Sequence, residues 1–65
     1  MRPRIQDLIK QLTTAGFVDR GGMDSHRNYR HPAGINLTVR GEPGDIAKHY
    51  IINNIKKAIY LVDYE

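Results

Sequence analysis

The sequence lacks several features that would point to whole classes of protein. It contains no cysteine, so neither disulfide bridges nor thiolate metal sites are available to it. It has no apolar run near the roughly 18 residues that a membrane-spanning helix requires. The start of the chain also lacks the apolar stretch of a signal peptide. We therefore expect a cytoplasmic protein with no membrane partner.

Length and charge narrow the possibilities further. The 65 residues suffice for one domain at most, so we expect residues 1–65 to form a single domain with one thin apolar layer. Ten lysines and arginines face seven aspartates and glutamates, a net charge of +3 that favours a polyanionic partner, nucleic acid first. No helix-turn-helix is visible, so direct DNA binding is not expected. No histidine pair has HxxxH or HExxH spacing, so we expect neither a metal nor another cofactor.

The first segment has the period of an amphipathic helix. Its apolar residues recur at i, i+3, i+4 and i+7, on one face: Ile5, Leu8, Ile9 and Leu12. Pro3 suits the first helical turn, where a missing N–H has no consequence. Gly16 suits the left-handed position just past the helix end, with Phe17 folding back onto Leu12.

Three strands are predicted next. The first is short, at residues 17–18, and the glycine pair 21–22 breaks it. The second covers residues 25–31 and the third, with strict apolar–polar alternation, residues 35–40. The turn at residues 32–34 makes the last two strands a hairpin.

Alternation also assigns side chains to the two faces of this hairpin. Tyr29 is the best candidate for the apolar face, which it would share with Arg27 and His31. The opposite, solvated face would then carry His26, Asn28, Arg30 and, from the third strand, Arg40.

A second helix is predicted from about Lys48 or His49. Its apolar stripe consists of Ile51, Ile55, Ala58, Ile59 and Val62. Asp45 is a possible cap for an earlier start. The order α-β-β-β-α predicts an α+β fold in which two helices cover one face of a three-stranded antiparallel sheet. Double-stranded-RNA-binding domains share this architecture.

His26 is the strongest candidate for chemistry. RNA carries its own nucleophile, the 2′-hydroxyl, so a histidine that removes its proton beside positive charge suffices for cleavage without a metal. Arg27, Arg30 and Lys48 are candidate contacts to the RNA backbone. On these residues alone, an ordinary polar residue on the solvated face of the strand remains the alternative interpretation of His26.

The other two histidines have different expectations. His31 precedes Pro32, which holds it extended, and we expect it to close the hairpin by packing and hydrogen bonding. His49 lies at the start of the second helix, where a phosphate is favoured, although a solvated first-turn residue is an equally good interpretation.

Several short motifs occur together along nearly the whole chain. They are Ala15-Gly16-Phe17, Ser25-His26, Tyr29-Arg30-His31-Pro32, Gly34, Val39, Asp45, Ala47-Lys48-His49-Tyr50 and Lys57-Ala58-Ile59. Together they resemble the HicA family of bacterial toxins. The resemblance implies a double-stranded-RNA-binding-like fold and a metal-independent endoribonuclease that cleaves mRNA. It also implies a HicB-like antitoxin that covers the active site, with His26 as the catalytic histidine.

The family motif places Ser25 directly before that histidine, and we count Ser25, with Arg27, Arg30, Lys48 and His49, among the predicted RNA contacts. Asp24 stands where the family has a glycine, and its charge repels phosphate. Two alternatives therefore stay open at this point. One is a non-catalytic RNA-binding module of the same fold, and the other is an impaired toxin that mainly binds its antitoxin.

Overall fold

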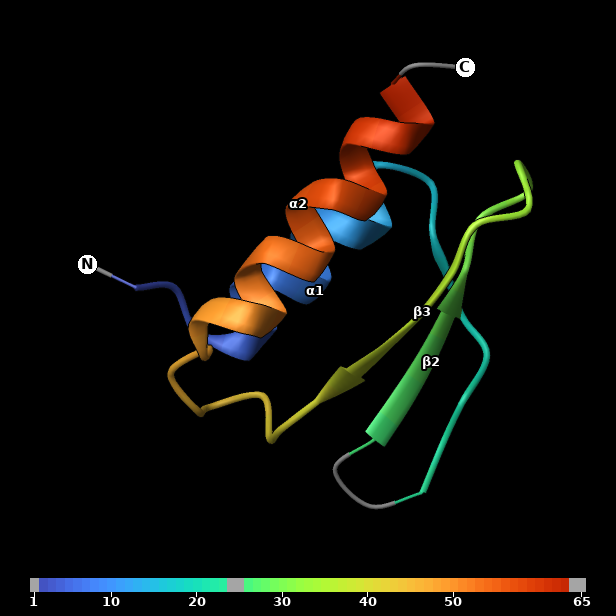
Figure 1. The fold of residues 1–65 in the computed structure, drawn as a ribbon. Helices are drawn as coiled ribbons and strands as arrows, with labels where there is room; N and C mark the ends of the chain where they lie inside the picture. Colours follow the sequence, from blue (N-terminus) through green and yellow to red (C-terminus); the bar gives the residue numbers. More distant parts are fainter. Residues whose placement is uncertain (1, 24–25, 64–65) are drawn as a thin grey trace.

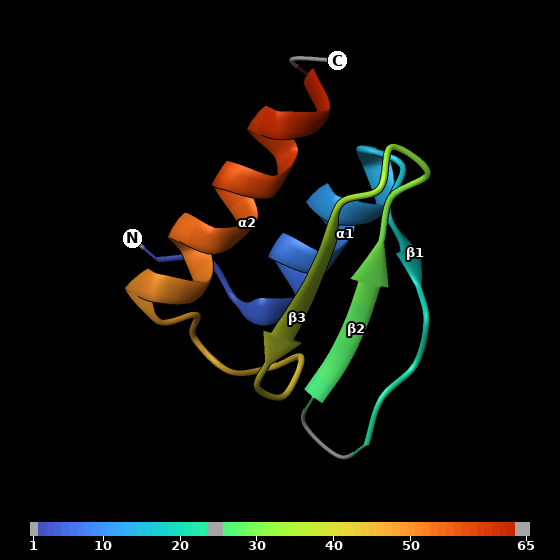
Figure 2. The same ribbon diagram turned by 45° about the vertical axis from the view of Figure 1, so that its right-hand side comes forward.

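The computed structural model describes residues 2–23 and 26–63 and shows two helices and three strands in the order α-β-β-β-α (Figure 1). The elements are α1 (Ile5–Thr14), β1 (Val18–Asp19), β2 (His26–Arg30), β3 (Asn36–Arg40) and α2 (His49–Asp63). The strands form one antiparallel sheet in the order β1-β2-β3, and they lie side by side in Figure 2. The predicted fold class and element order are confirmed.

Helix α1 ends as its sequence predicts. Gly16 has a φ of 101°, in the left-handed region that disfavours side chains. The Phe17 N–H donates to the Leu12 carbonyl and the Gly16 N–H to the Thr13 carbonyl, both at 3.0 Å, which is the pair of bonds that defines a Schellman motif. Because the Phe17 N–H is committed to the helix, β1 begins at Val18 rather than at Phe17.

The start of α1 differs from its prediction. Pro3 does not lie in the first helical turn: Arg4 is the N-cap, and its backbone N–H donates to Asp7 Oδ2 at 3.1 Å. Pro3 precedes the cap, and its carbonyl accepts a hydrogen bond from the Ala47 N–H at 2.9 Å. The Arg4 guanidinium donates to the Gly44 carbonyl at 2.5 Å. A segment distant in sequence therefore holds the first residues of the chain that the structure describes.

The loop between β3 and α2 also closes the first turn of α1. The first N–H groups of a helix have no partner within it. Here the Ile5 N–H donates to the Asp45 carbonyl and the Gln6 N–H to the Pro43 carbonyl, both at 2.9 Å. Backbone carbonyls of this loop therefore cap the helix in place of a side chain.

Helix α2 begins within the predicted interval, but Asp45 does not cap it. The Asp45 carboxylate instead accepts the Glu42 N–H at 3.1 Å and closes its own turn, so that prediction is wrong. The Lys48 carbonyl accepts the first bonds of the helix, from the N–H groups of Ile51 and Ile52 at 3.0 and 3.1 Å. After the turn at Asp45, the chain runs beside the residues that precede α1, where Ile46 forms a β-bridge with Arg4, before α2 begins.

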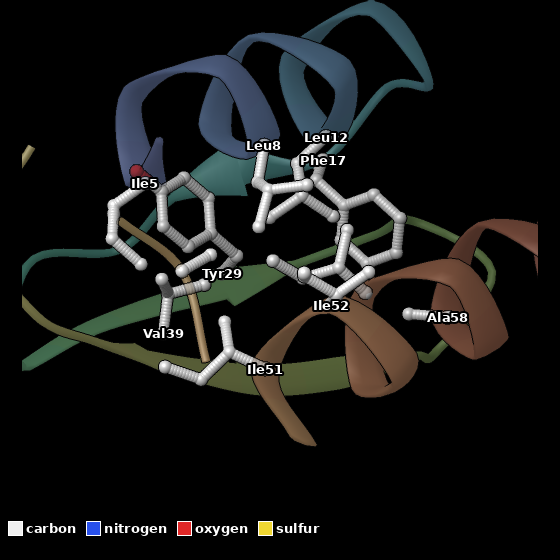
Figure 3. Packing of buried hydrophobic residues seen from close by; sticks show 11 residues of the cluster. Ile5, Leu8, Leu12, Phe17, Tyr29, Val39, Ile51, Ile52 and Ala58 are labelled. Carbon is white, nitrogen blue, oxygen red and sulfur yellow. The ribbon is translucent and has the colours of Figure 1, made fainter. Parts of the chain in front are cut away.

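The core lies between the two helices and one face of the sheet, as Figure 3 shows. Its buried members are Ile5, Leu8, Leu12, Phe17, Tyr29, Val39, Ala47, Ile51, Ile52, Ile55 and Ala58. Both helices and both longer strands contribute, so both helices cover the same face of the sheet. Ile9, Ile59 and Val62 of the predicted stripes pack only partly buried against this cluster, whereas Ile52 joins it without belonging to a predicted stripe.

Candidate functional site

The pairing of the strands divides the sheet into an apolar face and a polar one. His26 pairs with Arg40, and Tyr29 pairs with Asp19 on one side and Leu37 on the other. Because paired residues in an antiparallel sheet project to the same side, the buried Tyr29 fixes which face is covered. We call the uncovered side the outer face. Its residues by alternation are Val18, His26, Asn28, Arg30, Asn36, Thr38 and Arg40.

His26 is the first residue of β2 and is exposed. Its backbone N–H donates to the Met23 carbonyl at 3.0 Å. Its imidazole has no hydrogen bond or ion pair with the residues that the structure describes. The ring therefore lies on the outer face beside Arg40, and none of the described residues occupies its nitrogens.

Gly22 passes directly against the backbone of His26. A Cβ added to Gly22 would overlap the His26 carbonyl oxygen, and it would lie 3.0 Å from the Arg27 Cα. Real Cβ atoms essentially never approach backbone atoms so closely, so any side chain at position 22 requires the start of β2 to move. The backbone of His26 is thus tightly placed although its ring is open.

Arg27 points to the other side of the sheet from His26. Its Nη1 lies 3.2 Å from Asp19 Oδ2, in an ion pair that spans β1 and β2. Burial raises the pKa of the neighbouring Tyr29 hydroxyl above 10.0, the Asp19 carboxylate raises it further, and Arg27 lowers it. The structure thus separates Arg27 from the predicted group of contact residues around His26.

Arg30, Lys48 and His49, the other described members of that group, are exposed. Lys48 lines a hollow of about 200 Å³ together with Arg40, the strand partner of His26. Arg30 lies at the opposite end of β2 on the same outer face. His49 is the first residue of α2, next to Lys48 in sequence. Positive charge is therefore present at both ends of the outer face.

His31 has the packing role that its position before Pro32 predicts. Its Nδ1 accepts the Ala33 N–H at 3.0 Å, so in this arrangement Nε2 carries the proton and donates to the Ala15 carbonyl at 3.2 Å. The ring also meets Phe17 edge to face, with centroids 5.1 Å apart. These contacts join the hairpin turn to the end of α1.

Arg20 is a member of the outer face that the strand pattern alone does not predict. Its N–H donates to the Asn28 carbonyl at 2.7 Å, whereas the Asn28 N–H donates to the Gly21 carbonyl at 2.8 Å. Two residues thus oppose one, which is a β-bulge. Gly21 has a φ of 86°. The glycine pair after the first strand is the sequence signal for this bulge, although it predicts only a break.

Two of the residues singled out by sequence, Asp24 and Ser25, lie outside the described residues. Within residues 2–23 and 26–63, no group of three or more histidines and carboxylates is placed to hold a metal ion. The helices in this part of the chain lack the length and apolar character needed to cross a membrane.

Comparison with known proteins adds one match. None of the curated proteins compared with the chain matches it. A family model described as "HicA toxin of bacterial toxin-antitoxin" matches residues 5–61, from the first turn of α1 to near the end of α2. The match covers every helix and strand on which the outer face depends, and the chain therefore belongs to the HicA toxin family.

Proposed function

We propose that this chain is a metal-independent endoribonuclease, the toxin of a toxin–antitoxin pair, and that His26 is its catalytic residue. One observation carries the proposal. His26 is an exposed imidazole beside Arg40 on a basic face, and no described residue occupies its nitrogens. Membership of a toxin family supports the biological role.

The chemistry needs few groups. With its ring neutral, His26 accepts the proton of a ribose 2′-hydroxyl as the oxygen attacks the adjacent phosphorus. The bond to the 5′-oxygen breaks, leaving a 2′,3′-cyclic phosphate on one fragment and, once that oxygen is protonated, a 5′-hydroxyl on the other. Arg40, the strand partner of His26, would stabilise the negative charge on the phosphate, and Lys48, which shares a hollow with Arg40 and Asp45, is the second candidate for that role. His49, next to Lys48 in sequence, is the candidate for donating the second proton.

The predicted RNA contacts differ in how readily they could reach RNA bound at the outer face. Arg30 shares the outer face with His26, and Ser25 precedes His26 in sequence. Arg27 is engaged with Asp19 on the covered side and must leave that ion pair to reach RNA bound at the outer face. A HicB-like antitoxin would inhibit the enzyme by covering His26, because its ring is exposed and unoccupied by the described residues.

The first prediction concerns His26→Ala. Positioned general bases typically contribute about 10²–10⁴-fold to rate, so we expect cleavage of a defined RNA to fall by that factor. His49→Ala changes another exposed histidine, and it reports separately on the second proton transfer. Growth arrest on expression should be lost with His26→Ala. Equal cleavage by wild type and His26→Ala would remove His26 from the mechanism.

Two further controls address the class of reaction. Cleavage should persist in EDTA, and loss of activity there, restored by a divalent cation, would contradict the metal-independent mechanism. RNA that is retained by the wild-type protein yet stays intact after long incubation would instead favour a non-catalytic binding module.

A further inference from the structure

Two arginines, one opposite the middle of β2 and one at the end of β2 remote from His26, line a common hollow. Arg20 and Arg30 both line a hollow of about 220 Å³ together with Val18 and Pro32. The same two arginines also line a second hollow, of about 410 Å³, that extends across the sheet toward β3. This pair of arginines therefore lines both hollows.

The β-bulge explains how they meet. Val18 pairs with Arg30, and Arg20 forms a backbone hydrogen bond with Asn28, two residues before Arg30. Arg20 and Arg30 are therefore diagonal neighbours across the β1–β2 pair, at a Cα separation of about 7–8 Å that long side chains easily bridge. Gly21 is the extra residue of the bulge, so the chain leaves the sheet only after Arg20.

Within the described residues, no carboxylate forms an ion pair with Arg20 or Arg30. Among the outward-facing residues of the three strands there is no acidic side chain within the described part of the chain. The carboxylate nearest in sequence, Asp19, projects to the covered side, where it pairs with Arg27. Two like charges held close together are unfavourable unless an anion lies between them, so the arrangement is suited to an anionic ligand.

The distance from His26 identifies which phosphate of a bound RNA the arginine pair would contact. Arg30 is four residues along β2 from His26, or about 13 Å at the rise of a strand. A phosphate bound there cannot be the one under attack. It belongs to a nucleotide further along the same strand of RNA.

The middle of the outer face, between His26 and Arg30, suits a nucleic-acid backbone better than a protein partner. Thr38 donates to the Asn28 side-chain oxygen at 2.8 Å, so the middle of the face is a neutral, hydrogen-bonded surface. Val18, at 52% exposure, is the one large apolar side chain that the described strands present outward. Protein interfaces usually rely on buried apolar and aromatic anchors, which this part of the face lacks.

We propose that Arg20 and Arg30 form a phosphate subsite that holds single-stranded RNA at a nucleotide remote from the scissile bond. The inference rests on the proposed function for its position relative to cleavage. It goes beyond that function by naming Arg20 and by predicting a minimum RNA length. Short RNA reaches His26 alone, whereas longer RNA engages both ends of the outer face.

The test compares Arg20→Gln with Lys56→Gln, a matched loss of charge on the exposed side of α2. Non-cleavable 2′-O-methyl oligoribonucleotides of two to eight residues are titrated by fluorescence anisotropy at several salt concentrations. We expect Arg20→Gln to weaken binding of the longer strands about tenfold and to leave the dinucleotide unaffected. The slope of log K against log salt should fall by about 0.7, the value for one phosphate contact on a single strand.

Cleavage kinetics give a second measurement. With a long substrate, Arg20→Gln should raise KM and leave kcat unchanged, because the subsite binds substrate and transition state equally. Equal effects of Arg20→Gln and Lys56→Gln, or equal effects on two-residue and eight-residue strands, would overturn the subsite. The subsite would also be overturned if Arg20→Gln weakened binding to the antitoxin protein alone and left RNA binding unchanged.

The two proposals fail in different ways. If His26→Ala leaves cleavage unchanged while Arg20→Gln weakens binding of the longer 2′-O-methyl strands, the subsite stands and the catalytic assignment falls. If His26→Ala abolishes cleavage while Arg20→Gln changes neither binding nor KM, the catalytic assignment stands and the subsite is overturned.

Discussion

The two ends of β2 carry the same residue type in opposite circumstances. His31, just past the strand, uses both ring nitrogens and packs against Phe17. His26, at the start of the strand, has an exposed ring that no described residue engages. A histidine held at both nitrogens cannot accept a proton from a substrate without losing a contact, whereas an open one can. The difference in partners, rather than in residue type, makes His26 the candidate for chemistry.

The arginines of β2 repeat this contrast across the sheet. Arg27 is ion-paired with Asp19 on the covered side, while Arg30 lies on the outer face with Arg20. Charge that is already matched within the fold helps to hold β1 against β2. Charge that is unmatched on the outer face is available to a polyanion.

The largest effect on stability is expected from His31→Ala. It removes two hydrogen bonds, worth about 1 kcal/mol each, together with an edge-to-face ring contact, so unfolding free energy should fall by about 2–3 kcal/mol. His26→Ala, at an exposed position, should change it by less than about 0.5 kcal/mol. Urea denaturation of both variants measures the contrast. Equal destabilisation by His31→Ala and His26→Ala would contradict the difference between the two histidines.

A smaller and more local effect is expected from Gly22→Ala. The new Cβ overlaps the His26 carbonyl, so the start of β2 must shift, at a cost of about 1–2 kcal/mol. Gly44→Ala is a matched control, because a Cβ there meets no atom within 4 Å. We expect altered NMR shifts around His26 and slower cleavage for Gly22→Ala alone. Wild-type cleavage rates in Gly22→Ala would show that the backbone at His26 need not be fixed.

The smallest effect concerns Tyr29, which lies between His26 and His31 in sequence and projects to the covered side of the sheet. Its raised pKa means that the folded state favours the neutral phenol, whereas the unfolded chain ionises near 10.0. The stability linked to this group is therefore complete below pH 10 and is lost as pH rises above it. Tyr29→Phe should flatten the decline in stability above pH 10 and leave cleavage near neutral pH unchanged. An identical alkaline decline in both proteins would assign it to other groups.

Much of the framework follows from local sequence patterns. The apolar period of α1, the glycine that ends it and the alternation of β3 each depend on residues close together in the chain, and each is confirmed. The side of the sheet on which His26 lies also follows from alternation, once Tyr29 is assigned to the core. These features need no knowledge of tertiary contacts.

The errors and omissions share a different cause. Asp45 has the residue type of a helix cap, yet its carboxylate closes a turn with Glu42 instead. The close passage of Gly22 beside His26 and the placement of Arg20 both depend on how β1 lies against β2. Residue types and local periodicity carry no information about such approaches between segments. Alternation already assigns Arg27 to the covered face, but its ion pair with Asp19 depends on the pairing of β1 with β2 and was unpredictable for the same reason.

The loop that closes the first turn of α1 bears on the order of assembly during translation. The Arg4 side chain reaches the Gly44 carbonyl, 40 positions later in the chain. Chains are synthesised from the N-terminus, so α1 is complete as a polypeptide long before its capping carbonyls exist. Contacts of such sequence separation form late, because the entropy of closing the intervening loop is lost first. We therefore expect the first turn of α1 to become fixed only after the loop that follows β3 has been synthesised.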